Sequence, residues 1–234
     1  MTTTPYQPET GSFGSLRTVG LAADMYIRRL QYGYREDAPA AVATLARLRR
    51  GAGRPVLDVP DLWGMTGIEE LAELPEGERR GLDLDRAEQS LHLCLTLWAL
   101  HQQGHRDTGM HVRRRGLGWA VRELMAAHGT GKTPPATTDA QGTGNRTPAA
   151  ELNEPLRRRL VRAGTAGTPG VLAQRLREIV LLLRREAVPL DYGLLADQLY
   201  RWQQPAHAAQ VRRAWGRDFH LAALTRTKPS ASDA

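Results

Sequence analysis

Residues 168–219 decide the fold, and they read TPGVLAQRLREIVLLLRREAVPLDYGLLADQLYRWQQPAHAAQVRRAWGRDF. Thr168 and Pro169 open the stretch with a helix start signal, because a threonine side chain can cap the first free N–H groups and proline suits the first helical position. Apolar residues then recur at helical spacing, which predicts a long amphipathic helix with one face in a core. The members of this apolar stripe are Leu172, Leu176, Ile179, Val180, Leu183 and Ala187.

Two further helices are predicted in the same stretch. Pro189 ends the first helix, because it lacks an N–H group, and Asp191 is placed to cap the second. The second helix carries Leu194, Leu195, Leu199 and Trp202 on its apolar face, and the third carries Ala208, Val211, Trp215 and Phe219. The pattern indicates a helical hairpin with an apolar inside and a basic outside, in which Trp215 is a core residue.

The rest of the chain also reads as helices. Apolar periodicity predicts helices near residues 16–35, 39–50, 84–103 and 111–128, and a short helix that follows residue 151 and is held by Leu156, Leu160 and Val161. No region is rich in strand patterns. The sequence therefore predicts an all-α fold.

Composition divides the chain into segments. Residues 129–150 contain Gly, Thr, Pro and Ala with almost no large apolar side chain, which is typical of a flexible linker. We therefore predict two small helical bundles, residues 16–128 and 151–227, joined by the linker 129–150. Residues 1–15 and 228–234 are expected to be disordered tails.

The single cysteine, Cys94, excludes an internal disulfide and lies within a leucine-rich run, where a buried thiol is expected. No apolar run reaches the length of about 18 residues that a membrane span needs. The N-terminus lacks the pattern of a signal peptide. We expect a cytoplasmic protein without membrane contact.

Charge is unevenly distributed. The net charge is +7, and residues 1–150 hold 18 basic and 17 acidic residues, whereas residues 151–234 hold 14 and 8. Almost all the positive charge is arginine, whose planar fork suits phosphate. By contrast, the turn-rich passage 58–88 contains ten acidic residues and is expected to face solvent or a protein partner. The basic excess predicts a polyanionic partner for the C-terminal part.

Two runs partly match known functional motifs, a phosphate-binding loop and a zinc-binding helix, but each lacks required residues. Residues 129–133, Gly-Thr-Gly-Lys-Thr, lack the first glycine and the strand-to-helix context of a phosphate-binding loop. His101 and His105 have the spacing of a helical metal pair, with His111 nearby, but Gln102 replaces the glutamate of a zinc protease. We predict no enzyme activity, no metal, no cofactor and no small-molecule substrate.

Arginine clusters remain as the candidate site. Basic helix faces with occasional aromatic residues are typical of sequence-tolerant binding to single-stranded nucleic acid. Arg115, Trp119 and Arg122 are expected to point outward together. The candidate nucleic-acid-binding residues are Arg50, Arg115, Arg122, Arg158, Arg159, Arg162, Arg177, Arg184, Arg213 and Arg217.

Several runs of this sequence resemble the CasB family, the small subunit of the type I-E CRISPR surveillance complex Cascade. They are Val-Pro-Leu-Asp-Tyr at 188–192, Val-Arg-Arg-Ala-Trp-Gly-Arg-Asp-Phe at 211–219, Leu-Arg-Arg at 48–50 and Gly-Leu-Gly-Trp-Ala-Val at 116–121. The resemblance implies two helical bundles and a non-catalytic subunit that sits with a second copy and other Cascade subunits. It also implies that arginine-rich grooves hold R-loop DNA strands by their phosphates while the crRNA guide reads sequence. The alternative is a helical adaptor or transcription-regulator domain that binds an acidic partner or duplex DNA.

Overall fold

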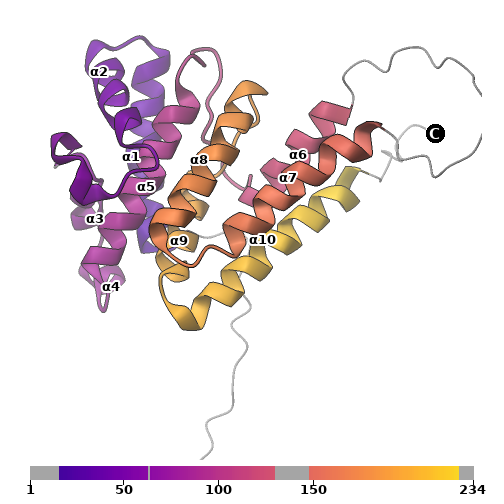
Figure 1. Ribbon diagram of the computed structural model, residues 1–234. Helices are drawn as coiled ribbons and strands as arrows, with labels where there is room; N and C mark the ends of the chain where they lie inside the picture. The colour runs from indigo at the N-terminus through magenta and orange to yellow at the C-terminus, as the bar shows by residue number, and fades with distance from the viewer. Residues whose placement is uncertain (1–15, 63, 130–147, 227–234) are drawn as a thin grey trace, which may run out of the picture.

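A computed structural model describes residues 16–62, 64–129 and 148–226 (Figure 1). The described residues form ten α-helices and three short 3-10 turns, which confirms the prediction of an all-α fold. The only extended pairing among them is an isolated parallel bridge between His111 and Leu190. The elements are α1 (Thr18–Arg35), α2 (Pro39–Leu48), η1 (Arg49–Gly51), η2 (Val56–Asp58), η3 (Pro60–Leu62), α3 (Ile68–Glu73), α4 (Glu76–Arg79), α5 (Leu84–Gln102), α6 (Leu117–Gly129), α7 (Pro148–Gly164), α8 (Pro169–Arg185), α9 (Tyr192–Trp202) and α10 (Pro205–Arg226).

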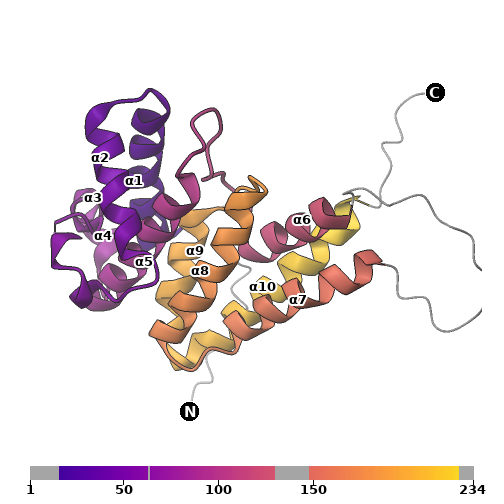
Figure 2. The ribbon, with the colours of Figure 1, turned by 45° about the horizontal axis from the view of Figure 1, so that its top comes forward.

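The helices lie in three neighbouring groups. Helices α1–α5 form one side of the molecule, α8 and α9 lie in the middle, and α6, α7 and α10 form the other side (Figures 1 and 2). Helix α6 precedes the predicted linker, yet it packs against α7 and α10, which follow it. The predicted division into an N-terminal bundle (16–128) and a C-terminal bundle (151–227) remains a prediction. The three groups of helices do not match it directly, because α6 lies with α7 and α10.

Helix α5 runs through the centre of the core. It contacts α1, α2, α8 and α9, so it is buried on almost every side. Cys94 and Trp98 are fully buried, as expected for the cysteine. Burial also raises the pKa of the Cys94 thiol well above its usual value. Leu91, Leu93, Leu95 and Leu97 alternate in the sequence as in a strand, but they lie on this helix, where all except Leu93 are fully buried.

The predicted caps of α8 and α9 are confirmed. Thr168 Oγ1 accepts a hydrogen bond from the Val171 N–H at 3.3 Å, and Asp191 Oδ1 accepts one from the Leu194 N–H at 2.9 Å. The prediction that Ala187 belongs to the apolar stripe of α8 is wrong. The helix ends at Arg185, and Ala187 adopts a left-handed conformation (φ 51°) in the turn that follows.

Trp215 anchors the seam between α9 and α10. It is 2% exposed, which confirms its prediction as a core residue, and its Nε1 donates to Gln198 Oε1 at 2.7 Å. On the other side of α10, Gly118 of α6 lies so close to the Trp215 backbone that a side chain at Gly118 would collide with it. Helices α6 and α10 therefore pack nearly backbone to backbone.

Two predictions near the candidate site are wrong. Helix α6 begins at Leu117, not near His111, because residues 111–115 are held in a loop with a turn by contacts to α1 and to the start of α9. Asp218 of α10 takes the place of a local cap, accepting a hydrogen bond from the Trp119 N–H at 3.0 Å. Val161 does not help to hold α7, since it is 55% exposed.

The predicted tails 1–15 and 228–234 and the Gly-Lys-Thr run at 131–133 lie outside the described residues, as does most of the predicted linker. At its two ends the helices reach into the linker, to Gly129 and from Pro148. None of the helices in the described part of the chain combines the length and apolar character needed to span a membrane.

Candidate nucleic-acid interface

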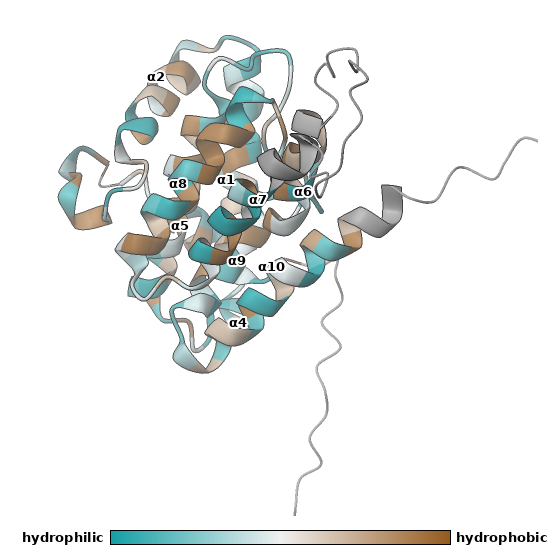
Figure 3. Cartoon of the chain, turned by 45° about the vertical axis from the view of Figure 1, so that its right-hand side comes forward, coloured by the Kyte–Doolittle hydropathy of each residue, from teal (hydrophilic) through white to brown (hydrophobic). Residues whose placement is uncertain are grey.

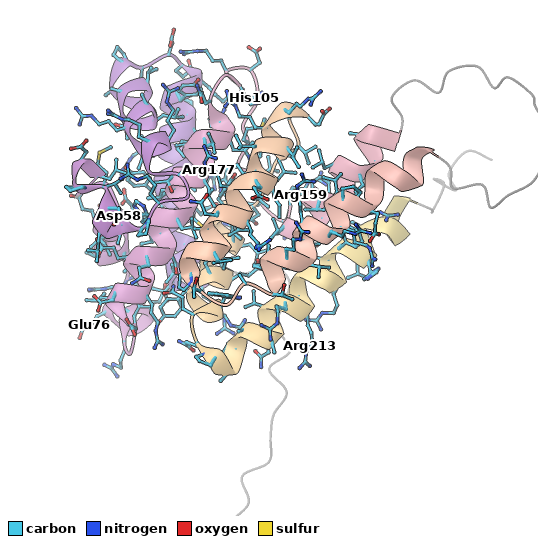
Figure 4. All side chains as sticks on the ribbon, in the orientation of Figure 1. Asp58, Glu76, His105, Arg159, Arg177 and Arg213 are labelled. Carbon is cyan, nitrogen blue, oxygen red and sulfur yellow. The ribbon has the colours of Figure 1, made fainter. Side chains whose placement is uncertain are left out.

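Five predicted arginines lie on two consecutive helices. Helix α7 packs on α8, and each helix turns its apolar residues inward, as Leu160 and Leu176 show by their burial. The arginines are left exposed or half-buried on the outer side, and Figure 4 shows Arg159 and Arg177 on these neighbouring helices. Hydrophilic residues are frequent on the visible turns of α7 (Figure 3). We call Arg158, Arg159, Arg162, Arg177 and Arg184 the arginine surface.

The turn after α2 adjoins this surface. Gln174 Nε2 of α8 donates to the Gly53 carbonyl oxygen at 2.8 Å, and a side chain at Gly53 would meet Arg177 Cδ at 2.8 Å. Gly53 has a positive φ of 81°, so glycine is required there both by conformation and by space. The close fit places Gly53, three residues after the exposed predicted residue Arg50, against Arg177.

Arg184 marks the other end of the arginine surface. Its Nε donates to the Gln103 carbonyl oxygen at 3.0 Å, while His105 Nε2 donates to the Arg184 carbonyl oxygen at 2.9 Å. An open hollow of about 390 Å³ lies between the ends of α5 and α8. Its lining residues are Gln103, Gly104, His105, Leu181, Arg184 and Arg185.

On α7 an acidic side chain holds two arginines. The Glu154 carboxylate accepts from Arg157 Nε at 3.0 Å and Nη2 at 3.2 Å, and from Arg158 Nε at 3.1 Å. These hydrogen bonds, first from Arg157 and then from Arg158, lower the pKa of the Glu154 carboxyl. All three side chains are at least 38% exposed, so water and salt screen the pairing.

The remaining predicted arginines lie elsewhere. Arg213 and Arg217 are exposed on α10, and Figure 4 shows Arg213 near the lower end of that helix, apart from Arg177. On α6 the Arg122 guanidinium lies over the Phe219 ring at 5.5 Å. The structure therefore does not join all ten predicted residues into one continuous surface.

Arg115 belongs to a basic turn that sequence reasoning recognised only in part. Its guanidinium lies over the Trp119 ring at 4.1 Å, and this tryptophan is half-buried rather than fully exposed. The two preceding residues, Arg113 and Arg114, are also exposed and were missed. The available signal was the run of three consecutive arginines between two predicted helices. We call Arg113–Arg115 the arginine turn.

The three histidines of the candidate metal motif have separate structural roles. His101 Nδ1 lies 2.9 Å from the Tyr192 hydroxyl, His105 is bonded to α8, and His111 Nε2 lies 2.8 Å from Asp24 Oδ1. Burial lowers the pKa of His101 to about 3, so its ring is neutral. Within the described residues, no group of three or more metal-ligating side chains comes together.

The acidic passage lies in the α1–α5 group, away from the basic helices α7 and α10. Figure 4 shows Asp58 and Glu76 at the edge formed by η2 and α4, away from Arg159 and Arg213. Most acidic residues of this passage are exposed, but Glu70 is 2% exposed and pairs with Arg29 of α1. The acidic edge around Asp58 and Glu76 is therefore separate from Arg159 of α7 and Arg213 of α10.

Comparisons with known proteins agree with this architecture. Residues 44–220 match the family model of CRISPR-associated protein Cse2. The crystal structure of CasB from Thermobifida fusca superposes with a TM-score of 0.68 and 48% identity, covering 88% of this chain and 99% of that one. The crystal structure of M. ruber CasB, at 20% identity, shares the fold with a TM-score of 0.56 over 88% of this chain and 95% of its own.

A search of curated protein sequences gave no significant match. The family model covers well over half of the chain, and the Thermobifida fusca protein shares nearly half of its residues. These matches favour a Cascade subunit over a transcription-regulator domain. The chain belongs to the CRISPR-associated Cse2 family, that is, the CasB family of type I-E Cascade.

Proposed function

We propose that this protein is a non-catalytic Cascade subunit that holds DNA strands of the R-loop on its arginine surface. The observation that carries the proposal is the placement of five arginines on the outer sides of α7 and α8. Because the apolar faces of both helices are used in the core, the guanidinium groups can contact phosphates without any change in packing.

The proposed binding does not depend on base sequence. Guanidinium groups on helix surfaces contact phosphate oxygens, which position a strand but carry no sequence information. Sequence recognition in guided complexes comes from base pairing with the crRNA. The arginine surface is therefore proposed to stabilise whichever DNA strand the R-loop presents to it, the displaced non-target strand or the target strand.

The proposed protein partners are other Cascade subunits and a second copy of this chain. The acidic side around Asp58 and Glu76 would repel DNA, so we assign it to contacts with protein. The outer sides of α7 and α8 are then left for nucleic acid, which competes with exposed Glu154 for Arg158.

The test is R-loop formation by the reconstituted complex over a series of salt concentrations. Each arginine that neutralises one phosphate contributes about −0.7 to the log–log salt slope for single-stranded DNA. The variant Arg158→Ala/Arg162→Ala/Arg177→Ala/Arg184→Ala is expected to make this slope shallower by up to roughly 3 units, with little dependence on target sequence.

Arg80→Ala is the matched control, because Arg80 is exposed beyond the end of α4 on the acidic side. It removes a positive charge without touching the arginine surface and should leave the slope unchanged. An unchanged slope and affinity for the quadruple variant, in a complex that still contains it, would contradict the proposed function.

A further inference from the structure

The arginine turn has a backbone conformation that arginine rarely adopts. Arg114 has a φ of 65°, in the left-handed region where a side chain is disfavoured. Among the described residues, five glycines share this region, and Asp37 and Ala187 are the other residues with a side chain that do so. An unfavourable residue that persists at an exposed turn points to a role for its side chain.

Buried Asp191 holds the backbone of Arg114 in this conformation by hydrogen bonds. This aspartate is 3% exposed, and its Oδ2 accepts from the Arg114 N–H at 2.7 Å. Its own N–H donates to the Arg115 carbonyl oxygen at 2.6 Å. The same carboxylate caps α9 through Oδ1, as described above. The position of the turn is therefore tied to the start of α9.

The buried pair His111 and Asp24 holds the N-terminal end of the arginine turn. His111 Nδ1 accepts from the Tyr192 N–H at 3.1 Å, so the ring proton on Nε2 is donated to Asp24 Oδ1. Asp24 Oδ2 in turn lies 3.1 Å from Arg113 Nη1. Burial would raise the pKa of Asp24, but the hydrogen bond from His111 and the charges of Arg113 and Arg28 outweigh burial and lower it.

The outer side of the turn carries unbalanced positive charge. Arg114 is exposed, and its guanidinium has no hydrogen bond or ion pair within the described residues. Arg115 is stacked on Trp119, which fixes the plane of its guanidinium and leaves the N–H edge available. Arg115 therefore offers an oriented donor, and Arg114 lies beside it on a backbone that buried hydrogen bonds hold in place.

We propose that the arginine turn is a preorganised binding site for the phosphodiester backbone of nucleic acid, separate from the arginine surface. Arg114 and Arg115 contact the phosphates, and Asp191 is a positioning residue. The proposal rests on the proposed function, and it adds a second anchor whose backbone, together with the plane of the Arg115 guanidinium, is fixed before binding. Preorganisation of this kind raises affinity because less conformational freedom is lost on binding.

Arg114→Gly separates this role from a structural one. Glycine adopts the left-handed conformation without the steric penalty of a side chain, so the melting temperature should stay the same or rise. R-loop formation by the reconstituted complex should nevertheless weaken several-fold, with a salt slope shallower by about 0.7 for one lost phosphate contact. Arg80→Ala is again the charge-matched control and should show neither effect.

Asp191→Asn tests the positioning role. It makes the chain more positive, so a purely electrostatic account predicts tighter DNA binding. Asparagine has one acceptor oxygen where aspartate has two, so the bond to Arg114 or the cap of α9 must be lost. We expect weaker R-loop formation despite the added charge; equal or tighter binding by a folded variant would exclude a positioning role.

Arg114→Gly gives the decisive result, since this variant is expected to fold. Normal affinity and slope in a complex that contains it would overturn the inference. If the quadruple variant of the arginine surface still weakens binding, only the arginine turn is excluded as an anchor. If neither variant has an effect, the proposed function fails as well.

Discussion

The arginine turn and the first half of α7 both present arginines to solvent, but carboxylates hold them in opposite ways. In the turn, buried Asp191 bonds the backbone and leaves the Arg114 side chain without a partner among the described residues. On α7, half-exposed Glu154 bonds the side chains of Arg157 and Arg158 themselves. One carboxylate positions an arginine for a ligand, whereas the other occupies the groups that a phosphate would contact.

This difference shows that a count of positive charges does not measure the capacity to bind phosphate. An unpaired arginine on a backbone that buried hydrogen bonds hold in place has no partner to exchange, so only its side chain must be ordered on binding. Charge that is paired at the surface must first exchange its partner, although the exchange is cheap because exposed ion pairs contribute little. The predictions below separate the two situations, beginning with the largest effect.

Trp215→Ala should disrupt both regions together. The indole lies in the α9–α10 seam, and α10 also carries the cap of α6, so the arginine turn and α7 share this support. Loss of a buried tryptophan typically costs about 3–5 kcal/mol, so denaturant unfolding should show a severely destabilised protein. Trp215→Phe keeps most of the volume and loses the bond to Gln198, so it should cost less. A well-folded Trp215→Ala protein with selectively weak DNA binding would reverse its assignment to the core.

Asp197 is a second buried carboxylate that, like Asp191, accepts hydrogen bonds from backbone N–H groups, and its effect on stability can be tested by changing the pH. It accepts the backbone N–H groups of Arg17 and Gly20, each at 2.7 Å, at the start of α1. Burial raises its pKa from 3.8 to about 6, and the two backbone hydrogen bonds only partly oppose this.

Because the pKa is raised in the folded state, Asp197 contributes most to stability below its unfolded pKa, and this contribution is lost as the pH rises through about 6. The loss is on the order of 3 kcal/mol at most. Asp197→Asn lacks this titration. The stability of the wild type relative to Asp197→Asn, from unfolding at several pH values, should therefore decline between about pH 4 and pH 7. If the difference in stability between the two proteins did not change with pH, burial would not raise the pKa of Asp197.

Glu154→Gln tests a carboxylate that holds arginine side chains at the surface, and it should have the smallest effect on DNA binding. Removing the carboxylate charge weakens its hold on Arg157 and Arg158, so DNA affinity should rise roughly two- to fivefold, as expected from the small energies of exposed ion pairs. Glu178→Gln on α8 is the matched control, because Glu178 is exposed and the same charge is removed without releasing an arginine. Equal gains for the two variants would mean that only net charge matters. Fluorescence anisotropy with a single-stranded oligonucleotide at low ionic strength measures both.

The helices and their caps could be predicted where the signals were local. Thr168 and Asp191 were recognised as caps because a capping side chain bonds an N–H group within the same turn. The start of α6 was wrong because His111 and the arginine turn are held by Asp24 and by Asp191, which are distant in the sequence. The left-handed conformation of Arg114 has the same origin, since no local pattern predicts it.

The candidate site was predicted in composition but not in arrangement. Helical spacing correctly placed the arginines of α7 and α8 outside the core. It could not show that the turn after α2 lies against Arg177, or that Glu154 holds Arg158, because these contacts depend on tertiary packing and rotamers.

The most direct test of the account is to map where DNA lies on the subunit in an assembled R-loop. Cys94 is fully buried with a raised thiol pKa, so a new exposed cysteine can be labelled selectively with a photo-crosslinker. Leu181→Cys places the label between Arg177 and Arg184 at a position that is 36% exposed, and Glu76→Cys places it on the acidic side. The account predicts crosslinks to DNA from position 181 and none from position 76. Crosslinks from position 76 alone, or from neither position in an intact complex with an R-loop, would contradict it.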